Sequence, residues 1–272
     1  MNDNYIFLND ISYGNHERQK VDILIPKKAK SGSGLILFIH GGGWHDGDKS
    51  AHYVDTKHFC NLGYICAAMN YRFVTDEISI FDELDDITSA LNKIREVCSE
   101  YGFSIDKSIL SGASAGGHLS LMYAYTRKNE APVTPVAVCA YCPPVNCAAP
   151  DFLLGISDEF ESWKYELLSK CCGYKLTKDT FLNCSEQVAL KNISPQEYLT
   201  PDCVPTAVFQ GKHDELIPFS HIIKFIGLLN ELRIKNDLLV YENSGHALDK
   251  DPETAVQSKN IINDYAERYF EV

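Results

Sequence analysis

A serine inside a glycine-rich turn is the residue of this chain best suited to act as a nucleophile. Gly112, Ser114 and Gly116 form the pattern Gly-x-Ser-x-Gly, between a short strand expected at 108–112 and a helical stretch at 115–127. At such a strand-to-helix junction the turn is sharp enough that side chains at positions 112 and 116 would clash. The serine hydroxyl then stands beside a helix N-terminus, which favours an anion. The alternative for this motif alone is a glycine-rich turn with an incidental serine.

A second glycine-rich segment follows the apolar run at 35–39, where positions 40–44 read His-Gly-Gly-Gly-Trp. Glycines let the backbone approach a ligand closely and direct N–H groups at it. We expect the N–H groups of Gly42 and Gly43, with that of Ala115, to form an oxyanion hole, and positions 41 and 44 are further candidates. The alternative is an ordinary strand-to-loop turn in which His40 is structural.

A serine nucleophile needs a base, and the chain has nine histidines. His246 is the best placed, because the segment Ser-Gly-His at 244–246 follows an apolar run at 238–241. The acid that orients it is expected in the loop after the preceding apolar run, at 206–210. Asp214 is the first choice there and Glu215 the second.

Together these side chains predict two-step acyl transfer. His246 takes the proton of Ser114 as the hydroxyl attacks an ester carbonyl, backbone N–H groups hold the oxyanion, and Asp214 orients the imidazole. Water then releases the acid. This chemistry requires neither a metal nor an organic cofactor. Because the base must be neutral, activity is expected to fall as the pH drops through about 6–7.

The elements that must position these residues form an alternating pattern. Strands are expected at 35–39, 63–71, 108–112, 136–141, 206–210 and 238–241, and helices around 50–61, 81–100, 115–127, 219–232 and 253–270. Strands that alternate with helices indicate a mostly parallel sheet covered on both faces. The segments 5–12 and 19–25 alternate apolar and polar residues, which predicts an antiparallel pair at a sheet edge.

The length of 272 residues suits one large α/β domain over 1–272. The stretch 143–204 breaks the alternation, since it offers helical pieces near 158–172 and 178–191 and no strong strand. It reads as an inserted helical cap-like region.

Composition excludes several classes of function. Lys and Arg number 25 against 37 Asp and Glu, so the net charge is −12. This charge disfavours nucleic acid and an anionic membrane surface as partners. The apolar runs are too short to span a membrane, and the N-terminus lacks the features of a signal peptide, so a cytoplasmic location is expected. The ten cysteines then read as reduced, mostly buried thiols, the Cys-x-x-Cys at 139–142 included.

From about residue 20 to its end, the chain resembles the α/β-hydrolase superfamily, in particular esterases with His-Gly-Gly-Gly-Trp and Gly-x-Ser-Ala-Gly-Gly. These are the hormone-sensitive-lipase-like and the acetyl- or feruloyl-esterase-like carboxylesterases. Further matching pieces are Asn-Tyr-Arg at 70–72, the segment 211–218 and Ser-Gly-His at 244–246. The resemblance implies an α/β-hydrolase fold of about eight strands with a small helical cap. It also implies Ser114 as nucleophile, Asp214 as acid and His246 as base, in the order of this superfamily.

The implied substrate is a small-molecule ester with a short, acetyl-type acyl group, and acetylated sugars are among the candidates. Esterases of this kind often form dimers, so the resemblance allows a homodimer. One alternative is an amide hydrolase, either of the arylformamidase type, which shares a His-Gly-Gly-x-Trp loop, or oligopeptidase-like, although there is no room for the large extra domain of the latter. A catalytically silent binding protein on a hydrolase scaffold is an alternative of another class.

Other conspicuous residues receive simpler interpretations. Trp44 and His40 are candidate substrate contacts, and the aromatic residues that line a pocket or pack in the core are Trp44, Phe73, Trp163 and Tyr165. We expect Asp48, Lys49 and Arg72 to tie loops to the sheet. Asp85 and Asp86, on the helix expected at 81–100, are expected to form a solvated face and a cap contact. Among the remaining histidines, His118 is expected to be structural, and His213 and His221 to lie at the surface.

Overall fold

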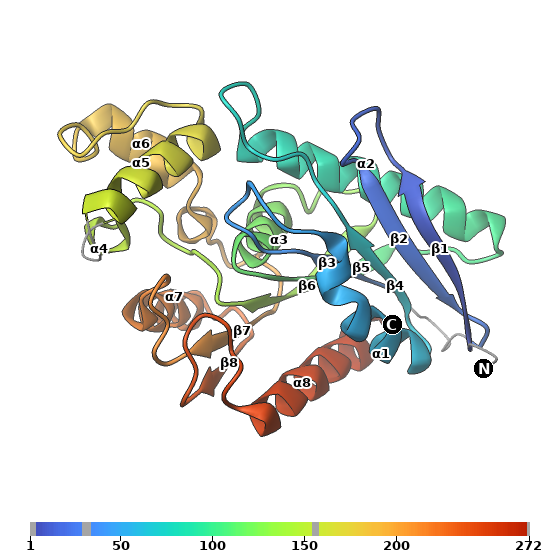
Figure 1. Cartoon of the computed structure of the whole chain (residues 1–272). Coiled ribbons are helices and arrows are strands. Elements are labelled where there is room, and N and C mark those ends of the chain that lie inside the picture. Colours follow the sequence, from blue (N-terminus) through green and yellow to red (C-terminus); the bar gives the residue numbers. More distant parts are fainter. Residues whose placement is uncertain (1–3, 29–33, 154–157, 271–272) are drawn as a thin grey trace.

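An eight-stranded sheet forms the centre of the molecule (Figure 1). The computed structural model describes residues 4–28, 34–153 and 158–270. The strands follow the spatial order β1-β2-β4-β3-β5-β6-β7-β8. β2 runs antiparallel to its neighbours β1 and β4, and the other adjacent pairs are parallel. This confirms the predicted edge pair and the mostly parallel sheet. The strands are β1 (Tyr5–Ser12), β2 (Lys20–Pro26), β3 (Leu35–Ile39), β4 (Ile65–Met69), β5 (Lys107–Ala113), β6 (Thr134–Tyr141), β7 (Thr206–Gly211) and β8 (Asn236–Tyr241).

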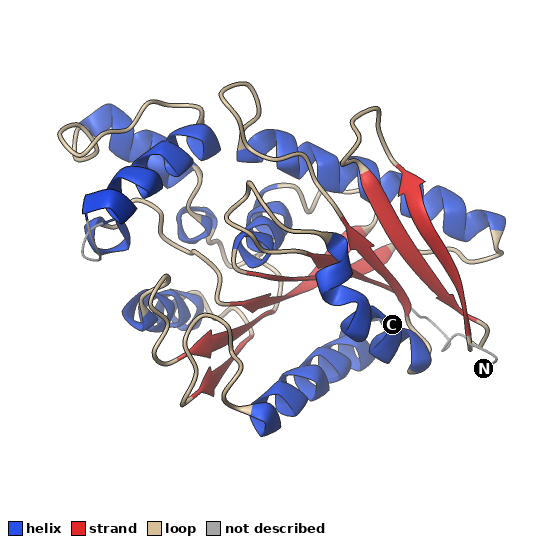
Figure 2. Cartoon of the chain, viewed as in Figure 1, coloured by secondary structure: helices blue, strands red, loops and turns tan. Residues whose placement is uncertain are grey.

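Helices cover both faces of the sheet (Figure 2). On one face lie α1 (Tyr53–Asn61) and α8 (Pro252–Phe270), and on the other α2 (Ile80–Glu100), α3 (Ala115–Thr126) and α7 (Phe219–Glu231). Successive residues of β3 alternate between the two hydrophobic clusters: Leu35 and Leu37 pack with α2 and α3, whereas Ile36 and Phe38 pack with α1 and α8. Because both faces are buried, such strands read as continuous apolar runs.

The start of α2 corrects one expectation. Asp85 is exposed as predicted, but Asp86 is buried, so the solvated face expected for it is wrong. Its carboxylate pairs with the Arg72 guanidinium at 2.8 Å and accepts a hydrogen bond from Gln19 at 2.8 Å. Both partners come from loops distant in sequence, which a helical pattern cannot reveal. Arg72 thus ties the loop after β4 to the fold, as predicted.

The segment 143–204, which we call the insert, connects β6 to β7. It contains α4 (Pro150–Leu153), α5 (Asp158–Cys172), α6 (Cys184–Asn192) and a short 3-10 helix (Pro195–Tyr198), and no strand among its described residues. The second helix begins at 184 rather than at the expected 178, because residues 177–183 form turns closed by backbone bonds such as Phe181 N–H to Thr177 C=O. Figure 1 shows α4, α5 and α6 grouped on one side of the molecule.

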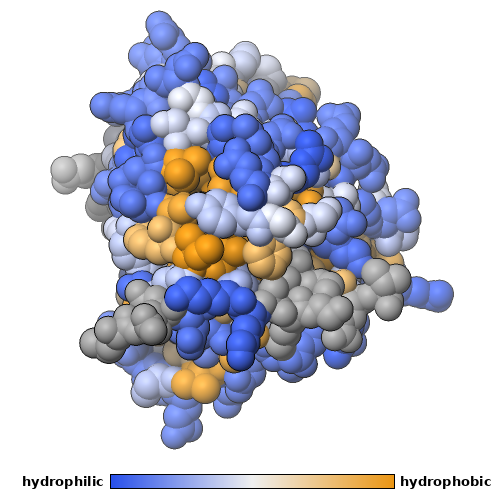
Figure 3. All heavy atoms as spheres, turned by 90° about the vertical axis from the view of Figure 1, so that its right-hand side faces the viewer, coloured by the Kyte–Doolittle hydropathy of each residue, from blue (hydrophilic) through white to orange (hydrophobic). Residues whose placement is uncertain are grey.

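Apolar side chains are exposed on one face of the molecule. Figure 3 shows a band of apolar residues between hydrophilic areas on the face turned toward the viewer. Phe7 of β1 is 44% exposed, and its ring lies 6.1 Å from that of Tyr53 in α1.

No helix in the described ranges has the length and apolar character needed to cross a bilayer. All ten cysteines are free, and seven of them are buried, as expected.

Candidate active site

Ser114 occupies a strained turn between β5 and α3. Its backbone has φ +53° and ψ −119°, outside the regions that L-residues favour. A Cβ atom at Gly112 would lie 2.5 Å from the carbonyl oxygen of Ile39, and one at Gly116 only 2.0 Å from the same oxygen. The turn is therefore pressed against the end of β3, and only glycines fit on either side of the serine. This is the geometry that the sequence motif predicted.

The loop at residues 40–47, which we call the glycine loop, passes directly beside this serine. A Cβ atom at Gly41 would lie 2.8 Å from the carbonyl oxygen of Ala113 and 3.4 Å from the Ser114 Cβ. Gly42 and Gly43 have φ values of +115° and +59°, which glycine adopts at little cost. Among the described contacts, no hydrogen bond uses the N–H groups of Gly42, Gly43 or Ala115. The N–H groups of Gly42 and Gly43 in the glycine loop, and of Ala115 in the adjacent turn, are thus left without a partner among these contacts, and such donors can receive a developing negative charge.

His40 holds the glycine loop in place, and the substrate contact expected for it is not supported. The ring is buried and stacks on Tyr71 at 4.3 Å between centroids. Its Nε2 lies 3.2 Å from a guanidinium nitrogen of Arg18, which can only donate, so Nδ1 carries the proton and donates to the Gly41 carbonyl at 2.6 Å. His40 lines neither of the two cavities that reach Ser114. Its contacts are therefore structural.

Trp44 and His118 connect the glycine loop to the insert. The Trp44 indole donates to His118 Nδ1 at 3.1 Å, so His118 Nε2 carries the proton and donates to the Ile193 carbonyl at 2.8 Å. His118 is thus structural, as predicted. Trp44 is buried, but it also lines a small cavity at Ser114, which keeps it a candidate substrate contact.

These two buried histidines predict a pH dependence of stability. Burial lowers the pKa of His40 and of His118 to about 4, from about 6.5 in the unfolded chain. Between these values the unfolded chain binds more protons, so the free energy of unfolding falls as the pH drops. The loss is about 1.4 kcal/mol per pH unit for each histidine, and it ends below pH ~4.

The measurement is urea unfolding followed by circular dichroism at pH 5, 6 and 7. Glu83 acts in the opposite sense, because burial, followed by the charges of Asp86 and Asp82, raises the pKa of its carboxyl group. The difference between wild type and His118→Gln is therefore the readout, since glutamine keeps a donor and an acceptor but does not titrate. We expect His118→Gln to have a shallower pH slope. Equal slopes would contradict a neutral buried His118.

Asp214 and His246 are joined as the sequence predicted. The loop after β7 carries Asp214, whose side chain is fully buried, and His246 Nδ1 lies 2.9 Å from its Oδ2. The carboxylate also accepts the N–H groups of Leu216 and Ile217 at 2.9 and 2.8 Å, and a bond from Gln210 at 2.8 Å. Burial alone would raise the pKa of Asp214, but the bonds from His246 and the backbone outweigh it and lower the pKa. An ionised acid thus orients the histidine.

Two cavities meet at Ser114. One, of about 590 Å³, is lined by Ser114, His246 and the glycine loop, and extends to α1 and α8. The other, of about 110 Å³, lies between the glycine loop and α5 of the insert. The structure therefore brings Ser114 and His246 into the wall of one cavity, although the described contacts include no hydrogen bond between their side chains. Such bonds are often formed only when substrate is bound.

Of the remaining predicted side chains, only Trp163 lines one of these two cavities. His213 is exposed as predicted, whereas His221 is buried and bonds Asp151 of the insert at 2.8 Å, so its predicted surface position is wrong. Trp163 lines the smaller cavity and is partly exposed. Glu215 accepts the backbone N–H of His246 at 3.2 Å, whereas the ring bonds described for His246 go to Asp214. The Arg18 guanidinium lies over the ring of Phe73, with its central carbon 3.6 Å from the ring centroid.

Sequence reasoning missed one residue of the site. Cys142, just after β6, contributes its thiol beside Asp214 and His246 and lines the larger cavity. The only signal for it in the sequence was its place at the end of a buried apolar run, because strand ends converge on the edge that carries Ser114.

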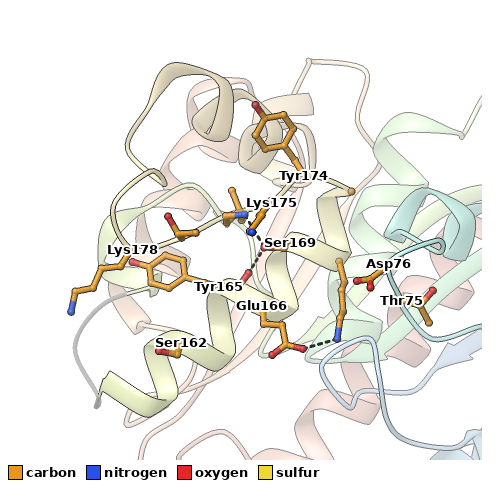
Figure 4. Close-up of a pocket in the computed structure, with 13 residues that line it drawn as sticks. Thr75, Asp76, Ser162, Tyr165, Glu166, Ser169, Tyr174, Lys175 and Lys178 are labelled. Carbon is orange, nitrogen blue, oxygen red and sulfur yellow. Dashed lines mark hydrogen bonds and ion pairs between the residues drawn. The ribbon is translucent and has the colours of Figure 1, made fainter.

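A separate cavity of about 660 Å³ lies between α5, the segment 173–178 and the loop at 75–76 (Figure 4). Tyr165, which was expected in a pocket or in the core, lines it, together with an ion pair between Lys170 and Glu166 at 2.8 Å. Its lining includes none of the predicted catalytic residues, so it is distinct from the site at Ser114.

Known proteins resemble the chain along most of its length. The chain is 29% identical over 228 residues to the probable carboxylic ester hydrolase LipM of Mycobacterium tuberculosis, covering 82% of this chain and 52% of that protein. It is 26% identical to the probable isoprenylcysteine alpha-carbonyl methylesterase ICME of Oryza sativa subsp. japonica, covering 88% and 58%. The chain thus spans about half the length of these curated relatives.

Solved structures share the fold. A truncated carbohydrate esterase from gut microbiota superposes with a TM-score of 0.78 at 16% identity, covering 98% of this chain and 99% of that one. The BD-FAE family matches residues 21–229, well over half of the chain. The eight-stranded sheet, the turn at Ser114 and these matches agree, and the chain belongs to the BD-FAE family and has the α/β-hydrolase fold.

Proposed function

We propose that this protein is a serine esterase that hydrolyses short-chain carboxylic esters. One observation carries the proposal: the strained Ser114 shares a cavity wall with His246, which an ionised Asp214 orients, close to backbone N–H groups that have no partner among the described contacts. Nucleophile, base, acid and oxyanion donors are the complete set that acyl transfer needs. The relatives LipM and ICME, named as ester hydrolases, support the same class of reaction.

The reaction follows from the roles of these groups. His246 Nε2 accepts the Ser114 proton while Oγ attacks the ester carbonyl, and the N–H groups of Gly42, Gly43 and Ala115 stabilise the oxyanion. The same histidine then protonates the leaving alcohol. In the second step it activates water, which releases the acid and restores Ser114. Asp214, held by two backbone N–H groups, keeps the proton of the neutral ring on Nδ1 and stabilises the imidazolium.

The smaller cavity favours a short acyl group. Its volume of about 110 Å³ is well below the 300–1,000 Å³ of pockets for drug-sized ligands. Its walls are mostly apolar: Trp44, Phe152, Leu167, Leu168 and Ile217. A Cβ atom placed on Gly43 would lie 3.7 Å from Leu167 Cδ2, so this leucine of α5 stands directly over the glycine loop. An acetyl or butyryl group would fill this space.

The larger cavity would then receive the alcohol. It has polar side chains at the end away from the glycine loop, where Asp55 pairs with Lys259 at 2.9 Å and Ser258 bonds two tyrosines. A leaving group with several hydroxyls, such as the sugar of an acetylated carbohydrate, suits a wall that offers both donors and acceptors. This supports acetylated sugars as the natural class of substrate.

Leu167→Ala tests the assignment of the acyl side. Wild type should cleave p-nitrophenyl acetate and butyrate faster than the octanoate. Removing the leucine side chain enlarges the small cavity, so the ratio of kcat/KM for octanoate over acetate should rise at least about tenfold, the lower end of the effect of one methylene in an apolar pocket. The matched control is Leu62→Ala, because Leu62 is an exposed leucine at the end of α1. This variant should leave the octanoate-to-acetate ratio unchanged.

The same panel separates ester from amide hydrolysis. N-formyl anilines, assayed beside the acetyl esters, should react at least an order of magnitude more slowly. Faster cleavage of the formyl anilines would replace the esterase proposal with a formamidase. A folded protein that is inert toward both sets of compounds would exclude the hydrolase assignment.

A further inference from the structure

A cysteine that the proposed mechanism does not use lies against its acid–base pair. Cys142 Sγ, a carboxylate oxygen of Asp214 and a ring nitrogen of His246 all lie within 4.8 Å of one another. The backbone holds the cysteine there: Cys142 has φ +44°, and its N–H donates to the Phe209 carbonyl at 2.8 Å. Three different donor atoms thus converge at one point.

The Cys142 thiol by itself is unreactive. Cys142 is 2% exposed, and burial, followed by the charge of Asp214, raises the pKa of its thiol well above the usual value. A protonated thiol is a weak nucleophile and a weak metal ligand. A cation bound between the three groups would reverse this, because it compensates the negative charges of thiolate and carboxylate together.

We propose that Cys142, Asp214 and His246 bind a soft divalent cation such as Zn²⁺, and that the bound cation inhibits the enzyme. Thiolate, imidazole and carboxylate are the ligands that Zn²⁺ uses in proteins, whereas Mg²⁺ and Ca²⁺ prefer oxygen alone. In a tetrahedral site the ligand atoms lie roughly 3.5 Å apart, given bond lengths of about 2.0–2.3 Å. The imidazole and carboxylate atoms, 2.9 Å apart, would have to separate slightly, and the sulfur, within 4.8 Å of both, would approach them slightly.

The inhibition follows from where the protons go. On binding, the thiol releases its proton to solvent and a bond forms between sulfur and the metal. The metal binds His246 Nδ1, the nitrogen 2.9 Å from Asp214, and the proton that Nδ1 carried moves to Nε2, so the neutral ring keeps its single proton there. A protonated Nε2 cannot accept the Ser114 proton, and the base is lost. No electron is transferred, so a chelator restores activity.

The larger cavity gives the cation a route. Cys142 and His246 both line this cavity, together with Ser114, so a cation can reach the three ligands from the substrate side. Occupation of the cavity by substrate and binding of the cation therefore compete.

Binding is measured without catalysis by titrating the Ser114→Ala variant with Co²⁺, which substitutes for Zn²⁺ and gives a thiolate charge-transfer absorption. We expect this absorption in Ser114→Ala and in Ser114→Ala/Cys184→Ala, where the cysteine removed is the exposed one on α6. Removal of Cys142, as alanine or as serine, should abolish it. The same absorption in the folded Cys142 variants would overturn the site.

Inhibition rests on the proposed esterase function and is measured separately, with p-nitrophenyl acetate and Zn²⁺, each variant being compared with its own metal-free rate. Cys142→Ala should raise the Zn²⁺ concentration for half-inhibition at least ~10-fold, and Cys184→Ala should not change it. Mg²⁺ should not inhibit. Equal sensitivity of wild type and the Cys142 variants would refute the proposal, whereas a cobalt absorption in a protein without esterase activity would refute the function and leave the metal site standing.

Discussion

Replacing Ser114 with alanine should lower kcat/KM for p-nitrophenyl acetate by at least ~10³-fold, because no other group in the turn can form the acyl-enzyme. The turn itself should survive the change. Its shape depends on the two flanking glycines and on backbone bonds, among them the Ser114 N–H to the Tyr141 carbonyl at 2.7 Å. The variant should therefore fold and bind substrate, with the loss appearing in kcat.

The matched control is Ser111→Ala, in the strand β5 that leads into the turn. The Ser111 hydroxyl is buried and donates to the Cys139 carbonyl at 2.9 Å, and it lines neither cavity at Ser114. Its removal should cost about 1 kcal/mol of stability and change kcat/KM less than fivefold. A Ser114→Ala protein that kept a tenth of the activity would require another nucleophile.

Asp214→Asn should lower kcat by about 10⁴-fold, because the amide cannot serve all the donors that the carboxylate serves. One of its positions becomes an NH₂ group, which faces either the N–H groups of Leu216 and Ile217 or the His246 ring. In the first case the loop loses its bonds. In the second the histidine is held with its proton on Nε2. Stopped-flow or steady-state assays with the acetyl ester measure the change.

Glu215→Gln separates the first choice of acid from the second. Glutamine retains the acceptor that receives the His246 backbone N–H, so the histidine loop should stay in place. We expect less than a tenfold fall in kcat. Should Glu215→Gln lose more activity than Asp214→Asn, the two carboxylates would have to exchange roles.

The order of elements was predictable because it depends on local patterns. The run at 35–39 is apolar on both strand faces, and the two glycines around Ser114 are dictated by the contact with β3. Asp214 and His246 were found in the same way, because each follows a strand that ends at the catalytic edge. Their roles in catalysis stay predictions that the variants above test.

The errors share one cause, which is pairing between segments far apart in sequence. Asp86 is buried because Arg72 meets it, and His221 because the insert supplies Asp151. His40 was a plausible substrate contact from the sequence alone, but its Nε2 lies 3.2 Å from the guanidinium of Arg18, which comes from the loop before β2. The pattern of apolar and polar residues along one segment does not show which charged side chain from a distant segment packs against it.

The chain of contacts from Trp44 through His118 to Ile193 has a consequence for domain grafting. The insert contributes the carbonyl that fixes the tautomer of His118, and His118 in turn accepts the Trp44 indole that shapes the glycine loop. Insert and oxyanion donors are therefore not independent modules. A chimera that takes this segment from another hydrolase should be active only if the grafted segment places a carbonyl oxygen within hydrogen-bond distance of His118 Nε2.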